Sequence, residues 1–323
     1  MTNKENALRI IRHRKPERIT TGPPCESISY FGCNHEDPET GKSHDEHKVS
    51  ESWKDIWGTL WVKEMEGVMA FPRGNPLAKV CDLNRFPWPD PDDVHLSGAI
   101  YEKAGRLRPG DHFVCGQNRD TLWERSYMLV GMENMMIYFY QEPEYVREIL
   151  RRIMDFQIGI ANHYIKAGAE MVNFSDDLGT QANLLISPAI LYDFFVPEYK
   201  RLSALYKEHG ILINFHSCGH IEPALELFTE LGVDILNPVQ ATANNLANIK
   251  KATYGKMALQ GGISSGLIET GPVERIVRDV KEKMALLGEG GGYFCCIDQY
   301  VPAPAEHMRA LDDTVERFGA YRS

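Results

Sequence analysis

Short apolar runs alternate with long amphipathic segments in this chain, and this alternation limits the folds that it can adopt. A chain built from repeated strand and helix units packs its strands into a parallel sheet and its helices against the sheet's outer face. The apolar runs predict strands at residues 19–22, 112–116, 170–175, 211–216, 233–236, 257–260 and 292–297. The amphipathic segments predict helices at residues 143–167, 188–208, 221–231 and 272–287.

Glycines at the ends of three predicted helices support this division of the chain. Gly168, Gly210 and Gly232 each suit the position after a helix, where the backbone often turns left-handed. Seven strands are visible, and an eighth is not placed. The sequence therefore predicts an α/β protein, a single (β/α)8 barrel of the TIM type that spans residues 1–323. Active sites of such barrels lie at the carboxyl ends of the strands, so polar residues there are the candidates for function.

Composition and charge exclude several classes of function. The net charge of −10 over 323 residues argues against nucleic acid or an anionic membrane surface as a partner. No apolar stretch approaches the roughly 18 residues that cross a bilayer, and the start of the chain lacks the apolar core of a signal peptide. The seven cysteines, an odd number spread along the chain, do not resemble a disulfide framework. We therefore expect a cytoplasmic protein with reduced thiols, and a homodimer is left open.

The most specific chemical pattern in the chain is a histidine and a cysteine two residues apart. An apolar run at 211–215 leads directly into His216 and Cys218, and a strand end can present both side chains to one ion. Zinc takes nitrogen and sulfur ligands, and a catalytic zinc uses three protein ligands and one open position. The pair therefore predicts part of a metal site. The alternative from the same residues is a hydrogen-bonded core histidine and an inert buried thiol.

A third ligand must come from elsewhere in the chain. Cys295 and Cys296 are the obvious sources, because they lie in the strand predicted at 292–297. Side chains alternate along a strand, so only one of the two is expected to face the barrel interior. We favour Cys296, which is nearer the end of the strand. Asp298 is another source of an oxygen ligand.

Other polar residues follow the predicted strands. Asp176 and Asp177 come after the strand at 170–175, and both neighbouring like charges and burial raise a carboxyl pKa. The pair therefore offers a candidate catalytic acid. The alternative is that one aspartate caps the following turn while the other is solvated. Three strand-end amides are candidate substrate contacts, with plain strand-end hydrogen bonding as the alternative: Gln117, Asn118 and Gln240.

Residues 31–91 interrupt the strand and helix pattern and predict a loop-rich insertion within the domain. The segments 33–35 and 44–47 place Cys and His at spacings that metal ligands use, but no strand pattern surrounds them. We therefore interpret these segments as a solvated loop. The insertion is expected to cover the barrel mouth or to form a docking surface. Its apolar bulk comes from four tryptophans: Trp53, Trp57, Trp61 and Trp88.

An ordered series of short motifs resembles the uroporphyrinogen decarboxylase superfamily, and within it the cobalamin-dependent methyltransferase branch. The most specific motifs are DDLGTQ at 176–181 and HSCG at 216–219. The whole series covers nearly all of the chain: residues 7–19, 53–58, 87–90, 131–134, 176–181, 186–188, 216–219, 237–240 and 261–263. The resemblance implies the barrel fold. It is less specific for the reaction, because fold alone does not fix function.

The methyltransferase branch holds zinc with His, Cys and a distant Cys, so the resemblance implies that His216 and Cys218 are two of the ligands. The family's distant cysteine lies just past the last strand, where this chain aligns Gln299. Glutamine is a poor zinc ligand, so it stays open whether zinc is bound differently or not at all. The resemblance further implies transfer of a methyl group between a small O-, N- or S-methylated substrate and the corrinoid (cobalamin) cofactor of a partner protein.

Two other functions compete with methyl transfer. The decarboxylases of the superfamily bind acidic porphyrinogens with an arginine-rich amino-terminal segment, whereas residues 20–27 lack that arginine pattern. A decarboxylase of a carboxylated pyrrole or aromatic acid would use Asp176 or Asp177 to stabilise a protonated intermediate and would need no metal. A non-catalytic partner of a corrinoid protein would keep its affinity after replacement of His216 and Cys218.

Overall fold

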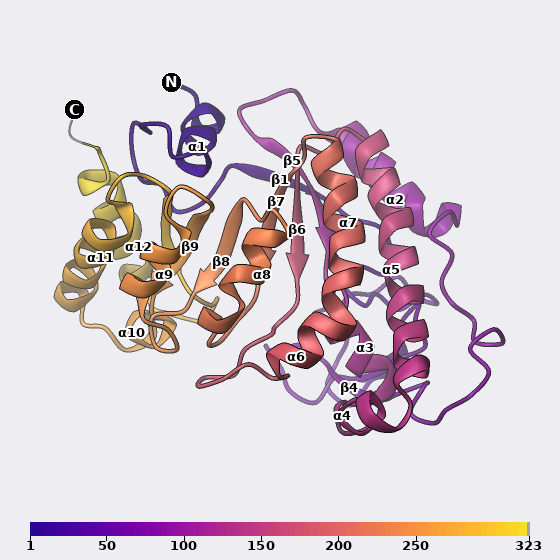
Figure 1. Cartoon of the computed structure of the whole chain (residues 1–323). Coiled ribbons are helices and arrows are strands. Elements are labelled where there is room, and N and C mark those ends of the chain that lie inside the picture. Colours follow the sequence, from indigo (N-terminus) through magenta and orange to yellow (C-terminus); the bar gives the residue numbers. More distant parts are fainter. Residues whose placement is uncertain (322–323) are drawn as a thin grey trace.

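The computed structural model describes residues 1–321 and confirms a parallel sheet with helices on its outer face (Figure 1). Seven strands pair in the order β1-β5-β6-β7-β8-β9-β10, and the sheet curls like half of a barrel. The strands are β1 (Cys25–Ile28), β5 (Phe113–Asn118), β6 (Met171–Ser175), β7 (Leu212–His216), β8 (Ile235–Val239), β9 (Ala258–Ile263) and β10 (Tyr293–Ile297). Because all pairs are parallel, the carboxyl ends gather at one rim. The last two residues of the predicted domain lie outside the described part of the chain.

Helices connect the strands and pack against the outside of the sheet, where most of the apolar core lies. The larger ones are α2 (Val94–Arg106), α4 (Met132–Gln141), α5 (Pro143–Lys166), α7 (Val196–Glu208), α11 (Val273–Gly288) and α12 (Ala305–Phe318). The shorter ones are α1 (Asn3–Ile11), α3 (Trp123–Val130), α6 (Pro188–Ile190), α8 (Leu225–Glu230), α9 (Leu246–Thr253) and α10 (Ser265–Thr270). The helices predicted at 143–167 and 272–287 are confirmed as α5 and α11. The segment predicted as one helix at 188–208 is instead α6, a π-helical turn at Leu191–Phe195 and α7.

No helix in the described part of the chain combines the length and the apolar character that crossing a membrane requires. The longest helix, α5, carries Arg147, Arg151 and Arg152 in ion pairs with acidic neighbours. Its buried residues recur every three or four positions, from Val146 and Ile149 onward, as expected for a helix with one face against the core.

The prediction of a strand at 19–22 is wrong, because the first strand of the sheet is β1, which pairs with β5. The prolines at 23–24 lack backbone N–H groups and cannot continue a ladder from the preceding residues. The carbonyl of Thr20 still accepts a hydrogen bond from the N–H of Cys295 in β10 (2.8 Å). The chain therefore passes from one edge of the sheet to the other between Thr20 and β1. The sheet in residues 1–321 has seven strands rather than the predicted eight.

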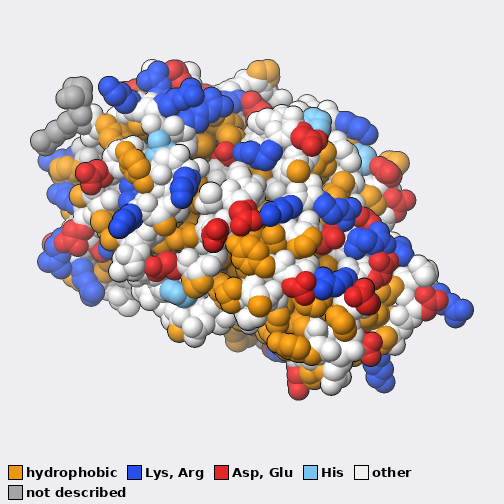
Figure 2. Space-filling view, in the orientation of Figure 1, with side chains coloured by type: hydrophobic (Ala, Val, Ile, Leu, Met, Phe, Trp, Pro, Cys, Tyr) orange, Lys and Arg blue, Asp and Glu red, His pale blue; other side chains and the backbone are white. Residues whose placement is uncertain are grey.

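Helix α1 closes the amino end of the curled sheet. Its buried residues Ala7, Ile10 and Ile11 pack against inward-facing side chains near the starts of six strands. These side chains are Phe113, Cys115, Met171, Leu212, Ile235, Ala258 and Phe294. Figure 2 shows Lys and Arg side chains gathered over this end of the molecule, on the outer side of α1. The amino end is therefore an apolar floor covered by a charged helix face.

Side chains alternate between the faces of a sheet, so the next inward residue lies two positions further along each strand. At these positions the inward side chains are polar rather than apolar. The inward residues at this second level are Gln117, Asn173, Asn214, Asn237 and Gln260, which line one cavity. Two residues further again, Arg119, Ser175 and His216 line the same cavity nearer the rim. The strands thus build an apolar floor, an amide level and a rim level in sequence.

The segment 31–91, which the sequence predicts as an insertion, contains a small antiparallel sheet of β2 (Ser52–Lys54), β3 (Leu60–Val62) and β4 (Phe71–Gly74). Its residues reach the carboxyl end of β5, where the guanidinium of Arg119 contacts Asn34 (3.3 Å) and Met69 (2.8 Å). Arg125 of α3 is 1% exposed and pairs with Asp55 of the insertion (2.9 Å). Buried ion pairs and rim contacts therefore join the insertion to the barrel.

The prediction of a solvated loop at 33–47 is wrong, because Cys33, His35, His44 and His47 are all buried. His35 stacks on Trp61 at 4.1 Å between ring centroids, and its Nδ1 lies 2.8 Å from the Nε2 of His44. Burial lowers the pKa of His44 to about 3, and neighbouring positive groups add to this effect. The tryptophans of the insertion bury these histidines. They form no metal-ligand cluster among the described residues.

Replacement of Ile10 by Ala tests the closure of the floor by α1. Ile10 is fully buried in the floor, and truncation of such a side chain leaves a cavity that costs about 2–4 kcal/mol in the free energy of unfolding. Urea denaturation measures the change. The matched control Arg12→Ala removes an exposed side chain at the end of the same helix and should change the free energy by less than about 0.5 kcal/mol. Equal effects of the two substitutions would contradict a floor sealed by α1.

Candidate functional site

One cluster of metal-ligating side chains lies at the carboxyl ends of β6 and β7. It contains Asp177, His216 and Cys218, whose ligand atoms all lie within 4.8 Å of one another. The Sγ of Cys218 is 3.4 Å from the Nε2 of His216, and that Nε2 is 3.6 Å from the Oδ1 of Asp177. The side chains of His216 and Asp177 are 38% and 39% exposed, so the cluster is open to small molecules.

Two glycines let the loops after β6 and β7 cross in direct backbone contact. Gly219 has a φ of +86°, and a Cβ there would lie 2.4 Å from the carbonyl carbon of Gly179. A Cβ at Gly179 would lie 2.7 Å from the carbonyl oxygen of Cys218, to which the N–H of Gly179 donates (3.2 Å). Only glycines allow this approach. The crossing brings Asp177, on the loop after β6, beside His216 at the end of β7 and Cys218 on the loop that follows.

Hydrogen bonds orient each member of the cluster. The Nδ1 of His216 bonds to the Oδ1 of Asn237 on β8 (2.8 Å), which leaves Nε2 directed at the other two side chains. The Oδ1 of Asp177 accepts from the backbone N–H of Cys218 (2.8 Å). Outer partners of this kind hold the ligands of metal sites in position.

Cys218 lies in an environment that disfavours its thiolate. Burial raises the pKa of the Cys218 thiol to about 12, and the negative charge of Asp177 adds to the rise. The Nε2 of Gln299 donates to the sulfur (3.1 Å) and opposes it. The thiol therefore keeps its proton at neutral pH unless a cation binds beside it, as cations do when they deprotonate a coordinating thiol.

The geometry of the cluster fits a small tetrahedral ion. Ligand bonds of about 2.0–2.3 Å at tetrahedral angles place neighbouring ligand atoms about 3.3–3.8 Å apart. The separations of 3.4 and 3.6 Å in the cluster fall in this range. Carboxylate, imidazole and thiolate are all zinc ligands, and three of them leave the fourth position open.

Neither Cys295 nor Cys296 belongs to the cluster, and Asp177 supplies the third side chain instead. Cys295 is fully buried in the core outside the sheet. Cys296 hydrogen-bonds with Gln260, so it faces inward as strand alternation predicts. It belongs to the amide level, however, and the cluster lies at the rim above it. Strand alternation therefore predicts the inward orientation of Cys296, but it does not predict how far that side chain lies from the cluster.

The two residues after β10 have different surroundings. The carboxylate of Asp298 accepts from the N–H (2.9 Å) and the hydroxyl (2.8 Å) of Ser265, and so holds the start of α10. Gln299 reaches the cluster through its hydrogen bond to Cys218. The position aligned with the family's distant cysteine thus does lie beside the cluster, but it carries an amide.

Asp176 and Asp177 have different environments. Asp176 is fully buried and accepts hydrogen bonds from the N–H groups of Leu122 (2.7 Å) and Glu124 (2.8 Å) and from the hydroxyl of Tyr199 (2.6 Å). It thereby caps the amino end of α3. Burial raises the pKa of Asp176 to about 7, although these hydrogen bonds oppose the rise. Of the two aspartates, only Asp177 belongs to the cluster.

The three amides expected to contact substrate are placed differently. Gln117 lines the cavity beside His216. Asn118 points the other way, is fully buried and bonds to Gln157 (2.8 Å). Gln240 accepts a hydrogen bond from the N–H of Gly219 and so supports the loop that carries Cys218. Only Gln117 among them faces the space in which a small molecule would bind.

That space is a cavity of about 410 Å³, within the usual size of small-molecule sites. Its lining residues are Asn34, Gln117, Arg119, Asn173, Phe174, Ser175, Asn214, His216, Asn237 and Gln260. Most of these were missed from the sequence. They could have been predicted from the polar residue that lies within each apolar strand. An inward polar residue in a barrel strand needs a hydrogen-bond partner inside the barrel.

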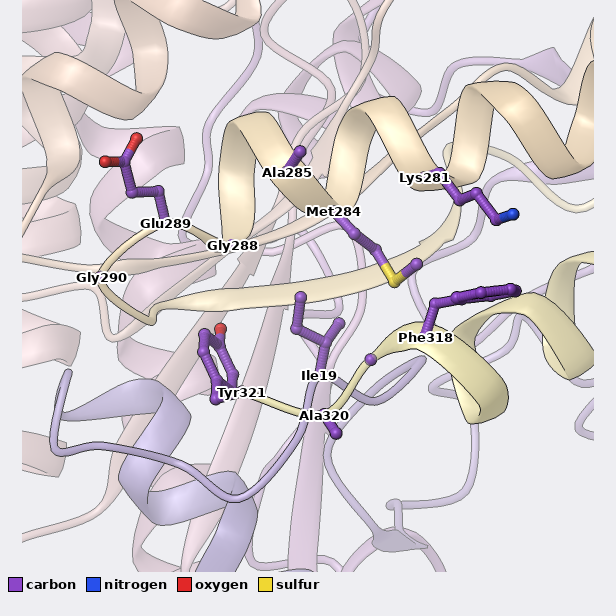
Figure 3. A pocket seen from close by; sticks show the side chains of 11 residues that line it. Ile19, Lys281, Met284, Ala285, Gly288, Glu289, Gly290, Phe318, Ala320 and Tyr321 are labelled. Carbon is purple, nitrogen blue, oxygen red and sulfur yellow. The ribbon is translucent and has the colours of Figure 1, made fainter. Parts of the chain in front are cut away.

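A larger hollow of about 650 Å³ lies at the opposite end of the strands (Figure 3). Figure 3 shows apolar side chains around it, among them Ile19, Met284 and Phe318, with Lys281 and Glu289 at its edges. Gly288 and Gly290 place it before the start of β10, on the amino side of the sheet. It contains no group of metal ligands among the described residues, so the smaller cavity at the strand ends is the candidate site.

Glu124 is a further functional candidate that the sequence did not reveal. Burial raises the pKa of Glu124 to about 9, and the nearby carboxylates of Asp120, Asp176 and Asp177 add to the rise. Its Oε1 accepts a hydrogen bond from the hydroxyl of Tyr127 (3.2 Å). Glu124 therefore stays protonated at neutral pH close to Asp177.

Comparison with known proteins places these features in context. A family model described as uroporphyrinogen decarboxylase (URO-D) matches residues 121–318. The chain is 26% identical over 238 residues to the uroporphyrinogen decarboxylase of Aeromonas salmonicida, with 68% of this chain and 62% of that one covered. It is 24% identical over 258 residues to that of Citrobacter koseri, with 75% and 70% covered. The chain thus spans less than two thirds of the length of the first relative.

A solved structure resembles the fold over its full length. The methyltransferase from Methanosarcina mazei matches with a TM-score of 0.71, with 98% of this chain and 99% of that chain covered, at 18% sequence identity. The likeness shows that the two chains share the fold.

Substitution Glu124→Gln tests the buried proton near the cluster. The pKa of Glu124 is raised from 4.5 to about 9 by folding, so the folded state holds a proton that the unfolded state releases above pH 4.5. Stability is therefore lost as pH rises from 4.5 towards 9, and a glutamine, which cannot ionise, avoids the loss. We compare the free energy of unfolding of the variant with that of the parent at each pH. From pH 4.5 to pH 8, this difference should shift by about 1–4 kcal/mol in favour of the variant. Denaturation at both pH values measures this gain, and the exposed control Glu133→Gln should show none.

Proposed function

The chain belongs to the uroporphyrinogen decarboxylase (URO-D) family, and from this premise we propose that it is a methyltransferase. It transfers a methyl group between a small O-, N- or S-methylated substrate and the corrinoid cofactor of a partner protein. Asp177, His216 and Cys218 would hold a zinc ion that assists the transfer. One observation carries the proposal: the three ligand atoms lie within 4.8 Å of one another, and His216 Nε2 is 3.4 and 3.6 Å from the other two, beside a cavity that takes a small molecule.

The residues present fit such an ion. When bound, zinc supplies a Lewis acid that stabilises the heteroatom to which the methyl group is attached or from which it departs. The chain's own contribution is positional, since Asn237 fixes the ring of His216 and the N–H of Cys218 fixes Asp177. Gln299 donates to the Cys218 sulfur and supports its charged form. His216 lines the cavity, so a bound substrate lies directly against the cluster.

Glu124 has a role beside the cluster in this proposal. Its protonated carboxyl group lies close to Asp177, so the rim offers a proton next to the metal ligands. A leaving heteroatom that gains negative charge can take up this proton. Asp176, with both oxygens already engaged, supports α3 rather than the substrate in this scheme.

Decarboxylation is the alternative, since the curated relatives carry that name. A porphyrinogen with several carboxylates needs several cations to bind it, because buried charges must be paired. The cavity is lined by a single cation, Arg119, and by amides. This lining favours methyl transfer over decarboxylation of a polyacid. A decarboxylase would also keep its activity after removal of metal by a chelator.

Metal content of the purified protein is the first test. We expect about one zinc per chain in the parent, because three ligands and one open position form a complete catalytic site. Substitutions Asp177→Ala, His216→Ala and Cys218→Ser should each remove most of the metal. Elemental analysis after dialysis against a weak chelator measures it. The controls Cys295→Ser and Cys296→Ser should retain zinc, and loss of zinc in Cys296→Ser but not in Asp177→Ala would assign the third ligand to the cysteine.

The same proteins test the reaction. Cob(I)alamin and methylated substrates, or methylcob(III)alamin and thiol acceptors, report methyl movement through the cobalamin absorption spectrum. Methyl-transfer activity should fall at least a hundredfold in His216→Ala. After removal of the metal, added zinc should restore activity only to proteins that keep all three ligands. A parent protein that binds no zinc, or that decarboxylates an acid in the presence of chelator, would overturn the proposal.

Gln299→Cys provides an independent test of the geometry. The Nε2 of Gln299 lies 3.1 Å from the Cys218 sulfur, so a cysteine at this position would bring a second thiolate to the ion. We expect zinc affinity to rise at least tenfold, as measured by competition with a chromogenic chelator. Gln299→Ala should leave the affinity within a few-fold of the parent, because it removes a hydrogen bond and adds no ligand. A weaker affinity in Gln299→Cys would show that the residue does not face the ion.

A further inference from the structure

A level of carboxamides crosses the barrel interior below the metal-ligand cluster. Five consecutive strands, β5 to β9, each contribute one such side chain to the wall of the cavity: Gln117, Asn173, Asn214, Asn237 and Gln260. On the first three of these strands the amides are direct register partners. Barrel interiors at this depth are usually filled by branched apolar residues. The presence of one carboxamide side chain on each of five neighbouring strands is therefore unusual and needs a physical explanation.

The amides bond to one another only in part. The Nδ2 of Asn173 donates to the Oε1 of Gln117 (3.1 Å), and the Nε2 of Gln117 donates to the hydroxyl of Ser27 on β1 (3.0 Å). Asn237 accepts from His216. The network thus runs along the wall from β1 to β6 and resumes at β8, where it joins the metal-ligand cluster.

Three carbonyl oxygens in this level are buried and have no hydrogen-bond partner among the described residues. They are the Oδ1 atoms of Asn173 and Asn214 and the Oε1 of Gln260. Nearly all buried polar atoms in folded proteins are paired, so three unpaired acceptors around one cavity indicate that their partners come from a bound molecule. These partners must be hydrogen-bond donors.

The charge of the level restricts the ligand further. None of its five amides is ionisable, and Arg119 is two residues nearer the rim. On the flanking strands, Ser27 bonds to Gln117 and Cys296 bonds to Gln260. A carboxylate placed among three carbonyl oxygens would be repelled and unpaired. An aromatic or aliphatic group would leave the three oxygens without donors and would meet one apolar side chain in the lining, Phe174.

We propose that the amide level binds the hydroxyl-rich end of an uncharged substrate, and that the substrate is a methyl ether of a sugar or cyclic polyol. Hydroxyls on adjacent carbons donate to the three oxygens and accept from amide N–H groups. The methyl ether oxygen then lies at the upper end of the cavity, where His216 lines it. This inference rests on the proposed function for the reaction, but its binding step involves the amides and no metal.

Isothermal titration with chosen probes tests the binding step. The probes are 3-O-methylglucose and a mono-O-methyl inositol, with methoxybenzene and 4-methoxybenzoate as the apolar and anionic comparisons. We expect the two polyol ethers to bind at least tenfold more tightly than either comparison. Tighter binding of methoxybenzene or 4-methoxybenzoate, or no binding of any polyol ether, would overturn the proposal.

Two isosteric substitutions locate the binding to the amide level. Asn214→Leu and Gln260→Met each remove one of the unpaired oxygens at nearly constant volume, and each should weaken polyol-ether binding at least tenfold. The control Asn162→Leu alters an exposed amide on α5 that bonds to its own helix (3.0 Å), and should have no effect. Unchanged affinity in both folded variants, verified by circular dichroism, would overturn the proposal.

Repeating the titration with the parent protein after a chelator has removed any metal separates this inference from the proposed function. Polyol ethers should still bind within about threefold of the untreated affinity, because the amides that hold them are intact. If the parent holds no zinc and moves no methyl group but binds polyol ethers through Asn214, the methyl-transfer function fails and the amide site stands. If zinc binds and methyl moves from other substrates while polyol ethers do not bind, the amide site fails alone.

Discussion

The alternation of side chains along parallel strands is the constraint on which the rest of this structure depends. Every inward position on one strand has a neighbour at nearly the same height on the next, so residue types chosen at one height form a level across the sheet. Here the lowest level is apolar and sealed by α1, the next is built of amides, and the highest carries His216. The height of an inward residue along its strand therefore determines which groups it can contact. Cys296 faces inward, but it lies at the amide level and so does not reach the metal-ligand cluster.

The metal-ligand cluster needs support that the strands themselves do not give, because loops carry two of its side chains, Asp177 and Cys218. Two kinds of contact provide it. Asp176 binds the start of α3, and the glycine crossing at 179 and 219 holds the two loops against each other. Arg125 of α3 pairs with Asp55 and with Asp120 (3.1 Å), so the same helix that Asp176 caps also holds the insertion. A buried pair that loses one partner leaves an uncompensated charge, so these contacts are costly to break. The insertion and the cluster are thus supported by one connected set of buried polar groups.

The parallel sheet, α5, α11 and the His216–Cys218 pair were all predictable, because periodicity and ligand spacing are local properties of a sequence. The third member of the cluster was not, because Asp177 is brought there by a loop crossing that depends on two distant glycines. Sequence also could not separate Asp176 from Asp177, since adjacent residues differ only in the direction that the fold gives their side chains. The buried histidines of the insertion were misread for a similar reason: the tryptophans that cover them come from elsewhere in the segment.

The composition of the cluster has a consequence for the kind of methyl compound that suits it. Replacing a thiolate by the carboxylate of Asp177 leaves the ligand charge unchanged, since each contributes one negative charge. It makes the ligand set harder, however, and a harder site holds an oxygen-bearing group in the open position more readily than a thioether. Gln299 acts in the same direction, because its hydrogen bond withdraws electron density from the Cys218 sulfur. With zinc bound as proposed, the rim would thus favour an ether oxygen over a thioether sulfur, and the amides below it would favour hydroxyl groups, so both levels of the cavity support the proposed class of substrate.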